Sequence, residues 1–332
     1  MCEKCYKRGC SALFFNVQQA ATFLYLTPLA LKAHVDATQL HQRHHWFGLG
    51  LAVAGAILFS TKAIVAKLIY RYPVDAVTLI AFRMMFSLPI FAAIAWWQAR
   101  KNTPLSTSDR WRILFLGLVG YYLSSFLDFL GLQYISAGLE RLILFLTPSF
   151  VLFIHAVWFK RPIRKAQWIS LLVAYLGIVL VFMHDLSFNG KQVVLGAGLV
   201  LGSAIAYASY LIQSGEMVAR LGSLRLVSYA MCISSVACIG QFLVLRPIET
   251  FQQPLPVLGL SVINAIFCTV FPVFLTMFAV KRVGAAVASQ AGMIGPVSTL
   301  ALGAIFLQEQ VSSWQIMGAG LVIAGMYLLG RK

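Results

Sequence analysis

The sequence has few charged residues for its length. Only 11% of its 332 residues are charged, whereas 60% are hydrophobic, and soluble chains carry about a quarter charged residues. This composition excludes a soluble globular protein. Apolar runs recur along the chain, and each is long enough for a helix across a hydrocarbon layer of about 30 Å but too long for a barrel strand of about 10 residues. The sequence therefore predicts an all-α integral membrane protein.

The sequence also lacks the motifs of common enzymes and of ATP-driven pumps. His-Glu-x-x-His, Gly-x-Ser-x-Gly and the Walker sequence are absent, so a zinc hydrolase, a serine hydrolase and the direct use of ATP are not indicated. The loops between the apolar runs are too short for a soluble domain. We therefore expect no enzyme activity, no cofactor and no metal site. An integral-membrane enzyme and a non-transporting membrane subunit remain the alternatives.

Acidic residues are scarce. Ten Asp and Glu residues stand against 26 Lys and Arg residues, which gives a net charge of +16. If both termini are cytoplasmic, most basic residues fall in inner loops, and the outer loops hold Lys67, Arg71, Lys191 and Arg246. Basic inner loops are the usual signature of membrane orientation. We therefore expect a multi-pass protein of the inner (plasma) membrane, in contact with the lipid bilayer, with both termini cytoplasmic and no nucleic-acid partner.

Ten apolar spans are predicted, and they form two copies of one unit. The spans cover about residues 47–69, 74–97, 111–133, 138–159, 165–183, 192–213, 223–245, 256–280, 284–307 and 313–330. Pro148 and Gly177 recur 148 positions later as Pro296 and Gly325, and a fixed offset of this kind indicates a structural repeat. We expect an N-terminal extension over residues 1–46, a first repeat over 47–183 and a second repeat over 192–330.

The odd number of spans in each copy makes the second copy enter the membrane upside down. The expected fold is therefore ten transmembrane helices arranged as two inverted five-helix repeats. Such repeats can exchange conformations and open a central site to each side in turn. Pro148 and Pro296 are expected to interrupt equivalent helices and to act in gating. Gly198 and Gly202 form a GxxxG pair, which predicts a close helix approach.

These features resemble those of EamA-type members of the drug/metabolite transporter superfamily. Each copy ends in a Pro-bearing helix, a short polar turn and a Gly-containing helix. The segment Asp128-Phe-Leu-Gly-Leu-Gln-Tyr-Ile-Ser-Ala-Gly-Leu-Glu140-Arg141 looks like one bacterial subgroup of this family, and Arg83 falls on the family's frequent arginine. The resemblance implies a secondary transporter that moves a small organic metabolite, such as an amino acid or a related compound, outward across the inner membrane without ATP.

Five charged residues within the predicted spans occur in the first copy alone: Lys62, Arg83, Asp128, Glu140 and Arg141. Residues of other types occupy the equivalent positions of the second copy, so we expect some of these charges to serve the substrate or a coupling ion. Arg83 lies about 14 Å into its helix, near the bilayer midplane. A charge there is costly unless it faces a cavity or a partner. We expect Arg83 to bind an anionic group; the alternative is an arginine satisfied by helix carbonyls and Asp128.

The remaining candidates fall into two groups. Polar and aromatic side chains are expected to line the substrate path: Tyr121, Tyr207, Tyr210, Asn264 and Gln290. Lys62, Asp128, Glu140 and Arg141 are expected to act in gating or coupling. An acidic member would carry a coupling proton, and exchange for a counter-substrate is the other possibility. Asp128 and Arg141 are also expected to form an ion pair that fixes a hairpin. Lys62 is either an anchor whose stem extends outward or a pathway residue.

Overall fold

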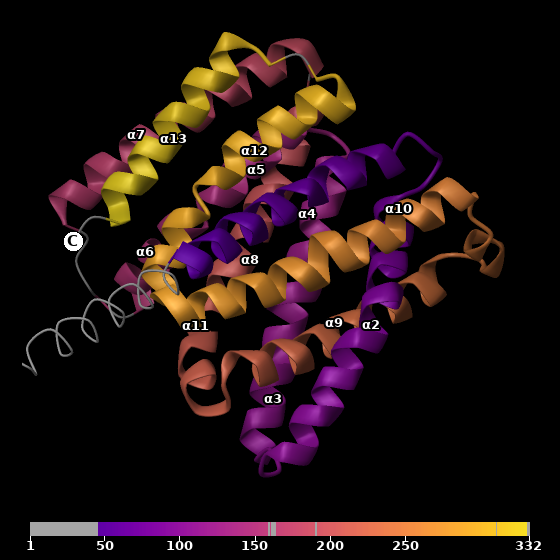
Figure 1. The fold of residues 1–332 in the computed structure, drawn as a ribbon. Helices are drawn as coiled ribbons and strands as arrows, with labels where there is room; N and C mark the ends of the chain where they lie inside the picture. Colours follow the sequence, from indigo (N-terminus) through magenta and orange to yellow (C-terminus); the bar gives the residue numbers. More distant parts are fainter. Residues whose placement is uncertain (1–45, 159, 161–163, 190, 310, 331–332) are drawn as a thin grey trace, which may run out of the picture.

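The computed structural model describes residues 46–330 apart from 159, 161–163, 190 and 310. Residues 1–45, most of the predicted N-terminal extension, lie outside this part. The chain is all-helical over the described residues (Figure 1). Eight helices are long and apolar enough to cross a membrane, and two shorter apolar helices cover Ile294–Leu307 and Ser313–Leu328. The predicted all-α membrane fold is confirmed.

The first copy contains five membrane helices. They are the helix Trp46–Ile69, α2 (Ala76–Lys101), the continuous α3–η1–α4 (Thr107–Leu116, Gly117–Leu123, Ser124–Leu132), the pair α5–α6 (Ala137–Phe145, Thr147–Trp158) and α7 (Lys165–Asn189). Leu146 forms a turn between α5 and α6. Pro148 is the second residue of α6, where its missing N–H removes no intrahelical hydrogen bond. The expected interruption of this helix is therefore present.

The second copy repeats this order. It contains α8 (Gln192–Leu221), α9 (Ser223–Leu245), a short turn η2 (Ile248–Phe251), the continuous α10–η3–α11 (Leu255–Ala265, Ile266–Val270, Phe271–Ala291), α12–η4 (Ile294–Leu302, Gly303–Leu307) and α13 (Ser313–Gly330). The predicted boundary between the spans 256–280 and 284–307 was wrong, because α11 continues to Ala291. The sequence there is rich in alanine and contains no proline, so nothing local ends the helix.

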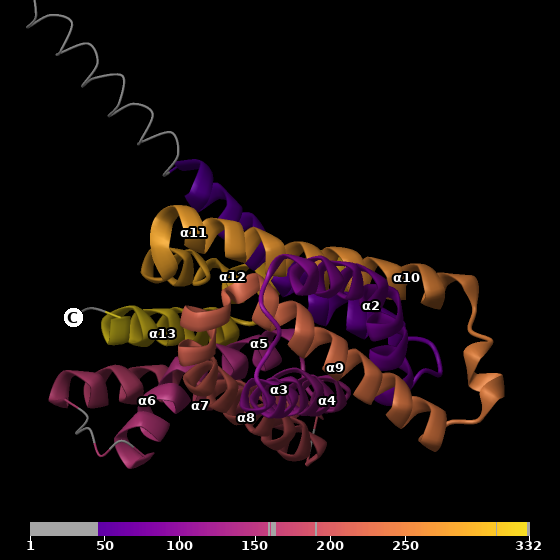
Figure 2. The same ribbon diagram turned by 90° about the horizontal axis from the view of Figure 1, so that it is seen from below.

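Glycines bring the two copies into backbone contact. Helices α7 and α13 lie side by side in both views (Figures 1 and 2). A Cβ on Gly177 would lie 2.5 Å from the carbonyl oxygen of Gly318. A second close approach joins α4 to α8, where a Cβ on Gly131 would lie 2.7 Å from the Gly196 carbonyl oxygen. The close approach predicted at Gly198 was wrong, since a Cβ there would meet no described atom within 4 Å.

Polar contacts show which loops lie together at each end of the helix bundle. At one end, Arg225 donates a 2.7 Å hydrogen bond from Nη2 to the Thr103 carbonyl, which joins the α8–α9 and α2–α3 connections. At the other end, Arg246 contacts Asp75 at 2.7 Å, beside the start of α2. Partial burial acts to raise the pKa of Asp75, but hydrogen bonds from Arg246 and Thr78 outweigh it, and the pKa lies below its usual value.

Candidate functional site

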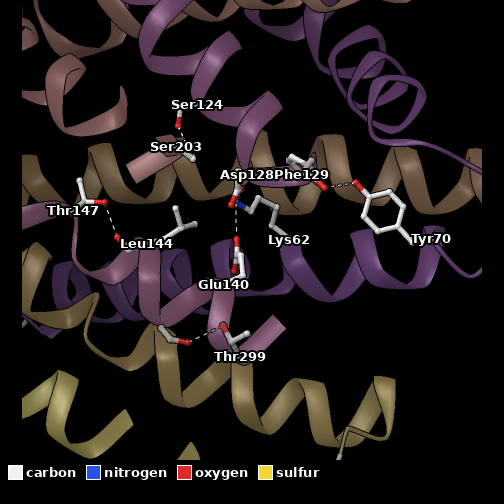
Figure 3. Close-up of polar contacts among 11 residues, drawn as sticks. Lys62, Tyr70, Ser124, Asp128, Phe129, Glu140, Leu144, Thr147, Ser203 and Thr299 are labelled. Atoms are coloured by element: carbon white, nitrogen blue, oxygen red, sulfur yellow. Dashed lines mark hydrogen bonds and ion pairs between the residues drawn. The ribbon is translucent and has the colours of Figure 1, made fainter. Parts of the chain in front are cut away.

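An ammonium group and two carboxylates meet in the interior of the bundle (Figure 3). Lys62 Nζ lies 2.5 Å from Asp128 Oδ2 and 3.4 Å from Glu140 Oε1. Lys62 is 5% exposed and Glu140 is fully buried. Lys62 therefore points inward, and its predicted alternative as an outward-reaching anchor was wrong. The Asp128–Arg141 ion pair was also predicted wrongly, because the ion-pair partner of Asp128 is Lys62.

Local structure places Glu140 in this ion-pair cluster. The Ser136 hydroxyl accepts a 3.1 Å hydrogen bond from the Leu139 N–H and caps α5, which places Glu140 in the first turn of that helix. In the part of the chain that the structure describes, both Glu140 oxygens lack a hydrogen-bond donor with suitable geometry. One ammonium thus faces two buried carboxylates. When both carboxylates are ionised, the cluster has a net charge of −1.

The buried ring of Phe129 connects this cluster to Arg83. Lys62 Nζ lies 5.4 Å and the Arg83 guanidinium carbon 5.0 Å from the centroid of the ring. Both distances are typical of cation–π contacts. The Tyr70 hydroxyl donates a 2.7 Å hydrogen bond to the Phe129 carbonyl and holds the backbone there. Phe129 was missed from the sequence, since a phenylalanine in an apolar helix carries no local signal of a role beside charges.

Arg83 extends from α2 of the first copy to the π-helical segment η3 of the second. Its Nε donates a 2.8 Å hydrogen bond to Thr269 Oγ1, and Thr269 in turn donates a 2.9 Å bond to the Asn264 carbonyl. Arg83 Nη1 is buried and has no hydrogen-bond partner among the described residues. The same holds for both polar atoms of the Asn264 side chain, which is fully buried. The structure thus links Arg83 through Thr269 to the backbone carbonyl of Asn264, the other predicted substrate-binding residue.

Arg141 approaches the second copy at the start of α12. A Cβ on Gly295 would lie 2.7 Å from Arg141 Nη2, so the guanidinium packs directly on this glycine, next to Pro296. The guanidinium carbon also lies 5.2 Å from the centroid of the Phe59 ring. Lys62 Nζ lies 5.4 Å from the same ring. Arg141 is therefore near the ion-pair cluster through Phe59, although it belongs to no described ion pair with Asp128.

The three predicted path tyrosines contact one another. The Tyr121 and Tyr210 hydroxyls lie 3.2 Å apart, and the Tyr207 and Tyr210 rings stack with centroids 5.6 Å apart. Tyr121 packs against the main hydrophobic cluster, which includes Phe129, and against a second cluster that includes Tyr210. It thus lies between Phe129, beside the charged residues, and the other two tyrosines. Gln290 belongs to α11, and its side chain lies outside the described part of the structure.

The charged side chains of the first copy therefore surround Phe129 and Phe59, and groups of the second copy complete their environment. Ionised, they amount to three cations, from Lys62, Arg83 and Arg141, and two carboxylates. A buried site with one excess positive charge and free N–H groups can bind an anionic group of a small molecule.

Known proteins with similar sequences are described as transporters. The profile of the EamA-like transporter family matches residues 46–183 and again 194–331. An uncharacterized transporter of Bacillus subtilis (strain 168), YcbK, is 28% identical over 282 residues, covering 82% of this chain and 90% of the relative. An uncharacterized transporter of Archaeoglobus fulgidus is 28% identical over 221 residues, covering 67% and 78%.

A solved crystal structure superposes with a TM-score of 0.60 at 16% identity and covers 85% of this chain and 95% of that one. At this identity the likeness concerns the fold alone. The two matches of the family profile fall on the two predicted copies, and both halves of the site lie within them. The protein is a multi-pass membrane transporter and belongs to the EamA-like transporter family.

Proposed function

We propose that this transporter moves an amino acid or a related small organic anion, and that Arg83 binds its carboxylate. The observation that supports this most is the buried Arg83 Nη1, which has no hydrogen-bond partner in the described structure. Buried polar groups are normally hydrogen-bonded. A substrate carboxylate would supply acceptors for the guanidinium, whose fork suits two parallel hydrogen bonds.

The charge balance supports the same class of substrate. Lys62, Arg83 and Arg141 outnumber Asp128 and Glu140 by one, so a single carboxylate neutralises the group. The charge balance therefore favours the related organic anion. An amino acid has no net charge, but the carboxylates beside Lys62 have oxygens without hydrogen-bond donors among the described residues, which could receive its ammonium. Asn264 and the tyrosines Tyr121, Tyr207 and Tyr210, with Gln290, would line the rest of the path.

We further propose that transport proceeds by alternating access between the two repeats, over residues 47–183 and 192–330. Pro148 and Pro296 lie in the first turns of α6 and α12 and would allow these helices to reorient. Glu140 would bind a proton in one state and release it in the other, which would couple export to the proton gradient. Exchange for a counter-substrate is the alternative source of driving force.

Counterflow in liposomes tests the substrate class and the role of Arg83 together. Vesicles with the purified protein are loaded with one unlabelled amino acid at a time, and uptake of the same labelled compound is measured. Arg83→Gln should reduce flux of the accepted compound by about tenfold or more, because a hydrogen bond to a charged group contributes about 1.5–3 kcal/mol. Arg100→Gln is the matched control, since Arg100 is exposed at the end of α2.

The two possible failures have different meanings. If Arg83→Gln folds and transports at the wild-type rate, Arg83 does not bind the substrate. If the wild-type protein gives no counterflow with any amino acid, the substrate class is wrong.

A further inference from the structure

The π-helical segments η1 and η3 occupy equivalent positions in the two copies. Shifted by the repeat offset of 148, η1 (Gly117–Leu123) falls on residues 265–271, which contain η3 (Ile266–Val270). π-helical turns are rare and often occur at functional sites. The π-helical turn is therefore common to both copies. The copies differ in the side chain at the equivalent position of this turn.

The equivalent side chains are Tyr121 and Thr269, and each hydroxyl contacts a residue of the other copy. Tyr121, in the first copy, meets the Tyr210 hydroxyl of the second. Thr269, in the second copy, accepts the hydrogen bond from Arg83 of the first. In each copy, the π-helical turn thus places a side-chain hydroxyl in contact with the other copy. In the second copy the Thr269 hydroxyl contacts Arg83, the cation that we propose binds the substrate.

The two hydrogen bonds of Thr269 fix the direction of its hydroxyl. The proton is donated to the Asn264 carbonyl at 2.9 Å, so the oxygen lone pairs face the Arg83 Nε at 2.8 Å. Thr269 is buried, and water does not compete for these bonds at its surface. With Nε occupied, the guanidinium can present only the edge formed by its two Nη groups to a carboxylate.

We infer that Thr269 is a positioning residue, which holds the Arg83 guanidinium so that its Nη edge receives the anionic group of the substrate. This inference rests on the proposed function, because it assigns Thr269 a role through Arg83. Threonine suits the task because its hydroxyl satisfies a backbone carbonyl and the arginine at once. Valine has the same shape but can do neither.

The test compares Thr269→Val with Thr269→Ser in counterflow of the amino acid that the wild type transports best. Without the hydroxyl, Arg83 is no longer oriented, and KM should rise about tenfold while kcat stays within about twofold. Thr269→Ser keeps the hydroxyl and should retain the wild-type KM. The matched control is Thr276→Val, which makes the same change at an exposed residue of α11.

A double-mutant cycle separates positioning from a purely structural role. In the Arg83→Gln background, Thr269→Val should add little further loss, because the group that it positions is gone. If the transport losses of Arg83→Gln and Thr269→Val add fully in the double variant, the inference is overturned. If Thr269→Val and Thr269→Ala both fail to fold while Thr269→Ser folds, the hydroxyl serves the fold, and the inference is equally overturned.

The outcome also distinguishes this inference from the proposed function. Wild-type kinetics for Thr269→Val, together with strong loss in Arg83→Gln, would reject the positioning role and leave Arg83 as the binding residue. Wild-type kinetics in both variants would reject the binding role of Arg83 itself.

Discussion

At the scale of single residues, Lys62 compensates two buried carboxylates, and we expect its loss to destabilise the protein. Lys62→Met removes the cation and leaves Asp128 and Glu140 buried without it, and breaking a buried ion pair in this way costs about 3–5 kcal/mol. The thermal unfolding midpoint of the purified protein in detergent should fall clearly. Lys281→Met, at an exposed position, is the control.

A compensating variant sharpens this prediction. Neutralising both carboxylates in the same chain, with Asp128→Asn and Glu140→Gln, should recover most of the loss, because no unmatched buried charge remains. A midpoint for Lys62→Met alone that equals the wild-type value would show that the ion-pair cluster does not hold the fold.

The residues of the candidate site were only partly predictable from sequence. Charged residues in apolar spans are conspicuous, so Lys62, Arg83 and Glu140 could be named. Their partners could not, because Lys62 and Asp128 lie on helices distant in sequence and pair through the tertiary fold. Thr269 was missed, since a threonine in a membrane helix usually bonds its own backbone and gives no sign of an arginine opposite.

At the scale of elements, the crossing of α7 and α13 depends on glycine. A Cβ on Gly177 would lie 2.5 Å from a backbone oxygen of α13 and cannot be accommodated without separating the helices. Gly177→Ala should therefore lower the unfolding midpoint in detergent. Gly198→Ala, where the Cβ meets no described atom within 4 Å, should have a neutral or slightly stabilising effect, because alanine is favoured over glycine in helices by about 0.5–1 kcal/mol. Equal midpoints for the two variants would contradict the tight crossing.

Elements were predictable where hydrophobicity alone defines them. Most helical segments and the interruption at Pro148 followed from apolar runs and a proline, whereas the boundary between the spans 256–280 and 284–307 did not. The glycine contacts were only partly predictable, because a Cβ on Gly202 would lie 3.3 Å from a side-chain atom of Leu127 in α4, whereas the backbone approach to α4 is made by Gly196 and not by Gly198. The π-helical segments η1 and η3 were also unpredicted, since a single extra residue in a turn leaves no trace in the hydrophobic pattern.

At the scale of the whole molecule, the structure separates two sets of loops that differ in charge. The α2–α3 and α8–α9 connections meet at one end through Arg225 and Thr103. The connections at the other end meet through Asp75 and Arg246, and Arg71 contacts the Leu307 carbonyl there. At each end, the contacts thus join loops that the sequence analysis assigns to the same side of the membrane. The sequence assigns most basic residues to loops on the side of the first end, which we propose is cytoplasmic.

Orientation can be measured with single cysteines in a variant whose six native cysteines are replaced. Gln252→Cys lies exposed near the start of α10, and Thr103→Cys lies exposed between α2 and α3. We expect a membrane-impermeant maleimide to label Gln252→Cys in intact cells and Thr103→Cys only after permeabilisation, because basic loops are retained in the cytoplasm. Transport by each variant is the control for native folding. The reverse labelling pattern would place both ends of the proposed path, and the direction of export, the other way round.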